Sequence, residues 1–136
     1  MNRHRTLDQL RAREAWKRVT EVIEAGGGDY SKDYGREVKR LPVRIQTAGL
    51  GQALSFLYAK SKAKGRDAKS QLLADLAGWL LDHRKLAARS KGAADRSALL
   101  QAIIDGDSDF LRRATDEALK YLQWLGRFTE AEIKQE

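Results

Sequence analysis

The sequence predicts an all-α fold: a compact single-domain bundle of about five to seven helices. Apolar side chains recur at intervals of three and four residues along most of the 136-residue chain, and glycines and potential capping residues separate these stretches. No stretch shows the period-two alternation bounded by turns that indicates a strand. The length suits one domain, which we expect to span residues 1–136, with frayed ends at residues 1–5 and 135–136.

The first two helices are separated by three consecutive glycines. The periodicity predicts a helix over residues 6–25, and Gly26–Gly28 end it. Asp29 or Ser31 can cap the second helix, which extends to Ala48. This helix carries an apolar stripe, which predicts one buried face. The stripe consists of Tyr30, Tyr34, Val38, Leu41, Ile45 and Ala48.

A break separates the second helix from a strongly apolar third one. Pro42 removes a backbone hydrogen bond, so we expect a kink or a short break there, or else a helix start. Gly49 and Gly51 predict a helix stop and restart. The third helix is expected over about residues 50–62. Because its residues leave little room for a polar face, we expect it in the middle of the bundle.

Three further helices complete the prediction. A helix with repeating leucines is expected over about residues 68–86, and a short fifth helix can start at Asp95 or Ser97. The last helix is predicted to begin at Asp107 or Ser108, both good capping residues, and to reach about residue 134.

The composition excludes several classes of protein. No apolar run approaches the roughly 20 residues that span a membrane. The basic N-terminus leads into an amphipathic helix without an apolar segment, so we expect no signal peptide and a cytoplasmic location. The absence of cysteine excludes disulfides, thiolate metal sites and a cysteine nucleophile. The net charge of +7, from 26 Lys and Arg against 19 Asp and Glu, favours a polyanionic partner such as nucleic acid.

The sequence contains no convincing catalytic constellation. The only histidines are His4 and His83, and Asp82-His83 lacks the further ligands that a metal-dependent hydrolase needs. Residues 105–109 begin like a calcium loop but lack its later glycine and glutamate. Residues 49–51 lack the third glycine and the preceding strand of a dinucleotide site. We therefore expect a protein without catalytic residues, metal or cofactor.

Basic residues recur beside the predicted core helices. Arg36, Arg40 and Arg44 are spaced to share one helical face near Pro42. Spaced cations suit the phosphates of a nucleic-acid backbone and carry no base information, although the simpler interpretation is solubility. The candidate backbone-binding residues are Arg11, Lys17, Arg18, Lys39, Arg40, Arg44, Lys60, Lys62 and Lys64.

Two separated blocks of sequence resemble a known family. Leu41-Pro42, Ile45 and then residues 49–57, GLGQALSFL, are followed much later by residues 117–128, EALKYLQWLGRF. In order, spacing and chain length these blocks resemble the small α-helical subunit of the type III-B CRISPR effector, the Cmr complex. The resemblance covers most of the chain.

The resemblance implies a non-catalytic structural subunit of a prokaryotic, RNA-guided antiviral complex that targets invading RNA. Its implied partners are guide RNA, target RNA, the backbone subunits, the large subunit and neighbouring copies of itself, with which it stacks. Basic surface residues that follow a sugar-phosphate backbone agree with this role, because guide–target pairing reads the sequence. Two alternatives remain: a helical protein–protein adaptor without RNA contact, and a small hydrolase built on Asp82 and His83.

Overall fold

The computed structural model describes residues 4–62, 64 and 66–134. Over these residues the chain forms six α-helices and one short π-helical segment without any β-strand, which confirms the all-α prediction. The expected fraying concerns ends that fall partly outside the described residues. The elements are α1 Leu7–Gly26, α2 Gly28–Ala48, α3 Leu50–Lys60, α4 Ala68–Ala77, η1 Gly78–His83, α5 Asp95–Asp105 and α6 Ser108–Glu132.

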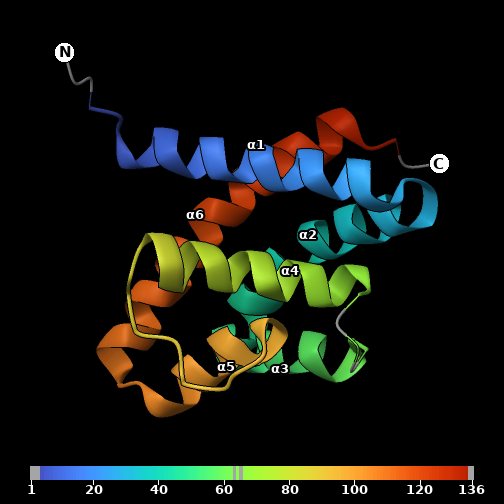
Figure 1. The fold of residues 1–136 in the computed structure, drawn as a ribbon. Helices are drawn as coiled ribbons and strands as arrows, with labels where there is room; N and C mark the ends of the chain where they lie inside the picture. The colour runs from blue at the N-terminus through green and yellow to red at the C-terminus, as the bar shows by residue number, and fades with distance from the viewer. Residues whose placement is uncertain (1–3, 63, 65, 135–136) are drawn as a thin grey trace.

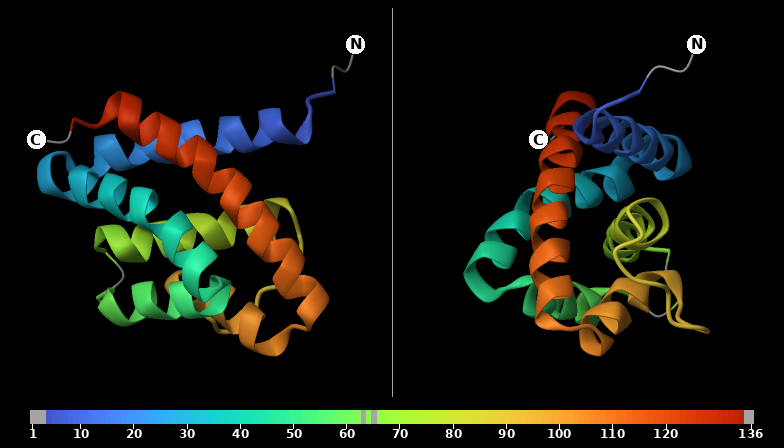
Figure 2. Two further views of the ribbon diagram at one scale, coloured as in Figure 1. Left: turned by 180° about the vertical axis from the view of Figure 1, so that it is seen from behind. Right: turned by 90° about the vertical axis from the view of Figure 1, so that its left-hand side faces the viewer.

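Helix α4 lies between α1 on one side and α3 with α5 on the other (Figure 1). The long helix α6 runs diagonally across the molecule, from the end that carries α5 to the end that carries α1 (Figure 2). Helix α2 packs against α3, α4 and α6. Through these contacts α2 belongs to the core and also forms an edge of the molecule with α3.

Most of the predicted stripe on α2 faces the core, but Ala48 at its end is exposed and Tyr30 is only partly buried. Tyr34, Val38, Leu41 and Ile45 are each no more than 3% exposed. They belong to the same core cluster as Leu72 and Leu76 of α4, and α2 packs against both α4 and α6. Burial of one apolar stripe per helix is the main stabilising contribution in such a bundle.

The predicted break at Pro42 is wrong, because α2 is helical from Gly28 to Ala48. The neighbouring Leu41 and Ile45 are buried on the same helix, and their packing offsets the hydrogen bond that proline cannot make. The helix stop predicted at Gly49 is confirmed: this residue has φ 89° and ψ 160°, and its N–H donates to the carbonyl of Ile45 at 2.8 Å. Gly51 lies within α3.

The expectation that α3 would be buried all round is also wrong. Leu50, Ala53, Leu54 and Leu57 are buried, but Phe56 is 46% exposed. Helix α3 lies at the edge of the bundle, packed on α2, α4 and α5. Its outer apolar side chain is therefore available at the surface.

The predicted helix over residues 68–86 changes its geometry midway. After α4 the segment η1 is π-helical, and the N–H of Arg84 donates to the carbonyl of Trp79, five residues earlier, at 2.9 Å. Within this segment Trp79, Leu80 and Leu81 are all buried. None of the helices formed by the described residues is long and apolar enough to cross a membrane.

Candidate nucleic-acid interface

A groove about 900 Å³ in volume separates the outer sides of α2 and α3, and we call it the α2–α3 groove. The predicted common face of Arg36, Arg40 and Arg44 is confirmed, because all three line this groove together with Lys39. The remaining lining residues are Val43, Thr47, Ala48, Gln52, Ala53 and Phe56.

Glu37 organises the cations at this edge of α2. Its carboxylate is buried, with 5% of the residue exposed. It lies 3.5 Å from Nη1 of Arg44, 3.6 Å from Nζ of Lys69 and 3.9 Å from Nη1 of Arg40. One buried negative charge thus faces three cations that reach the surface, and a positive excess remains.

Phe56 continues the groove from α2 onto α3. The Cζ atom of Arg44 lies 4.3 Å from the centroid of its ring, and the Nζ atom of Lys60 lies 5.8 Å from the same centroid. Both distances are within cation–π range. Arg44 therefore lies between the carboxylate of Glu37 and the ring of Phe56.

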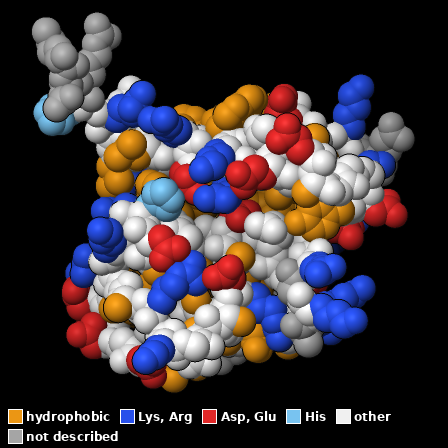
Figure 3. All heavy atoms as spheres, viewed as in Figure 1, with side chains coloured by type: hydrophobic (Ala, Val, Ile, Leu, Met, Phe, Trp, Pro, Cys, Tyr) orange, Lys and Arg blue, Asp and Glu red, His pale blue; other side chains and the backbone are white. Residues whose placement is uncertain are grey.

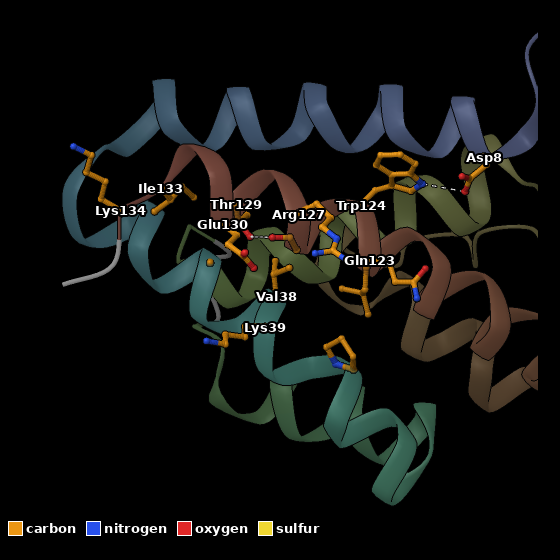
Figure 4. Close-up of a pocket in the computed structure, with 14 residues that line it drawn as sticks. Asp8, Val38, Lys39, Gln123, Trp124, Arg127, Thr129, Glu130, Ile133 and Lys134 are labelled. Atoms are coloured by element: carbon orange, nitrogen blue, oxygen red, sulfur yellow. Dashed lines mark hydrogen bonds between the residues drawn. The ribbon is translucent and has the colours of Figure 1, made fainter.

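Two other grooves carry charges of both signs. The α2–α6 groove, about 940 Å³, is lined by Lys39, Arg127 and Lys134 but also by Asp8 and Glu130. Figure 4 shows these residues, with the indole of Trp124 donating a hydrogen bond to Asp8.

The third groove, between α1 and η1, has acidic lining residues on α1, namely Glu14, Glu21 and Glu24. Of these three grooves, only the α2–α3 groove is lined by cations without acidic residues. It is therefore the best candidate for binding a polyanion.

The predicted basic residues fall into separate places. Lys39, Arg40 and Arg44 line the α2–α3 groove, and Lys60 reaches the ring of Phe56. Lys62 and Lys64 are exposed on the connection that follows α3, where Figure 3 shows basic side chains gathered at one edge of the molecule.

Lys17 and Arg18 lie on α1, away from the α2–α3 groove. Arg18 donates hydrogen bonds to Glu14 and Glu21 at 2.7 and 2.9 Å. Lys17 lines the α1–η1 groove beside these acidic residues. The structure thus brings together four of the nine predicted residues and leaves these two in mixed-charge surroundings.

Arg11 has a structural environment that does not suit contact with RNA. It is 7% exposed and donates from Nη2 to Oε1 of Glu117 at 3.0 Å. Glu117 also accepts from the indole of Trp79 at 2.9 Å and from Arg84 at 3.0 Å. Burial alone would raise the pKa of Glu117, but the hydrogen bonds from Arg11, Trp79 and Arg84 lower it to about 2. This cluster joins α1, η1 and α6.

A second buried polar cluster joins α2 to α4. Asp75 accepts hydrogen bonds from the hydroxyl of Tyr34 at 2.6 Å and from the amide of Gln71 at 2.8 Å. Burial raises the pKa of Asp75 to about 6, although both hydrogen bonds and the charge of Arg18 act in the opposite direction.

Asp82 and His83 each contact a neighbouring side chain. Arg89 donates to both carboxylate oxygens of Asp82, at 2.9 and 2.8 Å. The His83 ring stacks on Trp79. Across the residues that the structure describes, no group of three or more potential ligands is placed to hold a metal ion.

Sequence reasoning missed Phe56, Glu37 and Lys69. Phe56 looked like one core residue of an apolar helix. The spacing of Glu37 from Arg40 and Arg44, three and seven residues, was an available signal for the first two ion pairs. Lys69 comes from α4, and no local pattern predicts that contact.

Comparisons with known proteins agree on one family. Residues 7–132 match the family model described as CRISPR-associated protein (Cas_Cmr5). The chain is 33% identical over 131 residues to the CRISPR system Cmr subunit Cmr5 of Thermus thermophilus, and the match covers 96% of this chain and 99% of that protein.

A solved structure shows the same similarity in three dimensions. It is the X-ray crystal structure of a CRISPR-associated Cmr5 family protein from Thermus thermophilus, which matches with a TM-score of 0.75 and 30% identity. The match covers 96% of this chain and 100% of that one.

Proposed function

Because the chain belongs to the Cmr5 family, the small subunit of the type III-B CRISPR Cmr complex, we propose that it is a non-catalytic structural subunit of this ribonucleoprotein effector. In this role it stacks with neighbouring copies of itself along the backbone subunits, contacts the large subunit and helps to hold guide RNA and target RNA in the prokaryotic cytoplasm. The complex defends the cell by targeting invading RNA.

The α2–α3 groove is the observation that supports RNA contact. Lys39, Arg40 and Arg44 line it without an acidic neighbour in the lining, and Lys60 approaches the same ring that Arg44 covers. Cations arranged in this way neutralise phosphates and release condensed counterions, whatever the base sequence. Lys62 and Lys64 extend this surface beyond α3. Lys17 and Arg18 lie on α1, so they contact RNA only if the RNA also passes along that helix.

The double variant Arg40→Gln with Arg44→Gln tests the RNA contact. Glutamine is preferable to glutamate because a new negative charge would face the buried Glu37. We expect the affinity of the isolated chain and of the assembled complex for target RNA to fall about tenfold at moderate salt. We also expect the loss to be similar for unrelated RNA sequences and the dependence of log K on log salt to become shallower by roughly one to two.

A matched control removes the same charge elsewhere. Arg13 is exposed on α1 and Arg112 is exposed on α6, both outside the α2–α3 groove. The double variant Arg13→Gln with Arg112→Gln should retain nearly all of the affinity lost by the groove variant. If the groove variant folds, assembles and keeps the wild-type affinity and salt dependence, Arg40 and Arg44 do not contact RNA. If the wild-type chain and the assembled complex show no salt-dependent affinity for RNA, the chain is an adaptor without RNA contact.

A further inference from the structure

The ring of Phe56 is unusual among the apolar side chains of α3. Its neighbours Leu54 and Leu57 are no more than 1% exposed, whereas Phe56 is 46% exposed. Val43, across the groove on α2, is 63% exposed. A single exposed apolar residue needs no explanation, but here two of them line one groove between cations.

The surroundings of Phe56 differ from those of the other exposed aromatic residue. Trp16 is 48% exposed, but its ring packs edge-to-face on Phe128 with centroids 5.1 Å apart. The ring of Phe56 is instead approached by two cations, Arg44 and Lys60. An exposed ring bordered by positive charge provides a stacking surface beside an anion-binding surface.

Glu37 keeps this arrangement in place. The guanidinium of Arg44 is held between the buried carboxylate of Glu37 and the ring of Phe56, and 30% of its side chain remains exposed. Arg40 is 59% exposed on its side chain and lies only 3.9 Å from the same carboxylate. The planar guanidinium of Arg44 and the ring of Phe56 offer surfaces on which a base can stack. The more exposed Arg40 beside them offers a positive charge to the phosphate of the same nucleotide.

Only an unpaired nucleotide offers a free base face. In an A-form duplex each internal base is covered on both faces by its neighbours, so a protein contacts mainly phosphates and 2′-hydroxyls. In a single strand the bases can separate and stack on aromatic or guanidinium groups. Of these two kinds of RNA, only the single strand has base faces that can pack on the apolar residues of the α2–α3 groove.

We propose that the α2–α3 groove binds an unpaired RNA nucleotide, whose base stacks against Phe56 and Arg44 and whose phosphates contact Lys39 and Arg40. This inference rests on the RNA contact proposed above and adds to it a specific position for a base. It predicts that this surface of the protein prefers single-stranded RNA to duplex RNA.

The variant Phe56→Leu tests the stacking, with Phe56→Trp as the conservative counterpart. The probes are a single-stranded RNA 12-mer that carries 2-aminopurine, an abasic sugar-phosphate oligomer of equal length and the corresponding RNA duplex, each titrated into the full chain. We expect Phe56→Leu to weaken binding of the single strand about tenfold. Binding of the abasic oligomer, and its salt dependence, should not change. Phe56→Trp should restore the affinity and the quenching of 2-aminopurine.

The outcomes separate this inference from the general RNA contact. Equal binding of single strand and duplex by the wild-type chain, or an unchanged affinity of Phe56→Leu for the single strand, overturns the stacking while the phosphate contact stands. Loss of abasic binding in Phe56→Leu also overturns it, because the ring then acts only by holding Arg44. If the wild-type chain and the assembled complex show no salt-dependent RNA binding, both proposals fail.

The assembled complex provides the last test, because another protein subunit is the competing occupant of the groove. A photoreactive benzophenone side chain in place of Phe56 reports what lies against it. Crosslinks to RNA support the proposal. Crosslinks to a Cmr subunit instead of RNA overturn it.

Discussion

The buried carboxylates of Glu117 and Glu37 each have several cationic or hydrogen-bond-donating partners. Glu117 accepts hydrogen bonds from two guanidinium groups and one indole, and Glu37 lies within 4 Å of three cations. A buried carboxylate is tolerated when such partners compensate its lost hydration. Glu117 and Arg11 therefore belong to the framework of the protein, whereas the cations above Glu37 remain partly exposed.

Removal of the Glu117 charge should strongly destabilise the protein. In Glu117→Gln the mostly buried Arg11 keeps the exposed Asp8 but loses its buried carboxylate partner, which for a buried ion pair costs about 3 kcal/mol or more. Urea unfolding followed by circular dichroism measures the loss. The control Glu130→Gln changes an exposed glutamate on the same helix and should alter the free energy of unfolding by less than about 0.5 kcal/mol. Similar stability in both variants would show that the cluster is not a structural one.

Asp75 gives stability a distinctive dependence on pH. Its folded-state pKa of about 6 exceeds the ordinary aspartate value of 3.8, so between these values the folded state binds more protons than the unfolded state. The contribution of this group to the free energy of unfolding therefore falls as pH rises from 4 to 6 and is constant above that. The total decrease in the free energy of unfolding from this group is at most about 3 kcal/mol. Wild type minus Asp75→Asn, measured by urea unfolding at each pH, should show this fall.

Glu117 contributes to the free energy of unfolding with the opposite dependence on pH, and over a lower pH range. Its pKa is lowered to about 2 from 4.5, so its stabilisation is complete above pH 4.5 and disappears as pH falls toward 2. The difference between wild type and Asp75→Asn isolates the Asp75 contribution from this one. A difference that does not vary between pH 4 and 7 would contradict the raised pKa.

At the scale of elements, the corner between α2 and α3 depends on one glycine. Gly49 has φ 89° and ψ 160°, a backbone conformation that side-chain-bearing residues avoid. Gly51 is helical, and a Cβ atom there would lie 3.6 Å from Cγ2 of Ile103, an ordinary contact. The two glycines look equivalent in the sequence and have different roles in the structure.

Alanine substitutions should separate these two roles. Gly49→Ala should lower the free energy of unfolding by about 1–3 kcal/mol, because alanine is strained in that conformation. Gly51→Ala should be neutral or stabilising by up to about 1 kcal/mol, because alanine favours the helix. Thermal or urea unfolding of the two variants checks the contrast. Equal destabilisation by both would mean that close packing, rather than backbone geometry, requires the glycines.

For the whole molecule, periodicity predicted most of the helices because burial of one stripe per helix dominates the fold. The stripe of α2 follows from helical periodicity, and Asp107 caps α6 as predicted, its carboxylate accepting from the N–H of Phe110 at 2.9 Å. Helix α5 begins at Asp95 as predicted, but its N-cap is Ala94 and no side chain caps it. No local rule predicted the π-helical turn of η1, in which the ring of Trp79 stacks on Tyr121 and its indole N–H donates to Glu117.

The candidate site was predictable only in part. The shared face of Arg40 and Arg44 followed from helical spacing, but local sequence cannot distinguish an exposed arginine from Arg11, whose partner Glu117 is 106 residues away. For the same reason Phe56 could not be separated from the leucines around it. Assignments that depend on which helix lies opposite require the three-dimensional structure.

The buried Glu37 also has a consequence for the entropy of binding. Long cationic side chains normally lose rotamer freedom when a ligand immobilises them, at about 0.5–1.5 kcal/mol each. Arg44 is already confined between Glu37 and Phe56 in the free protein, so much of that loss occurs during folding. An anion that reaches this surface meets a side chain already positioned, and the affinity gained per contact is correspondingly larger.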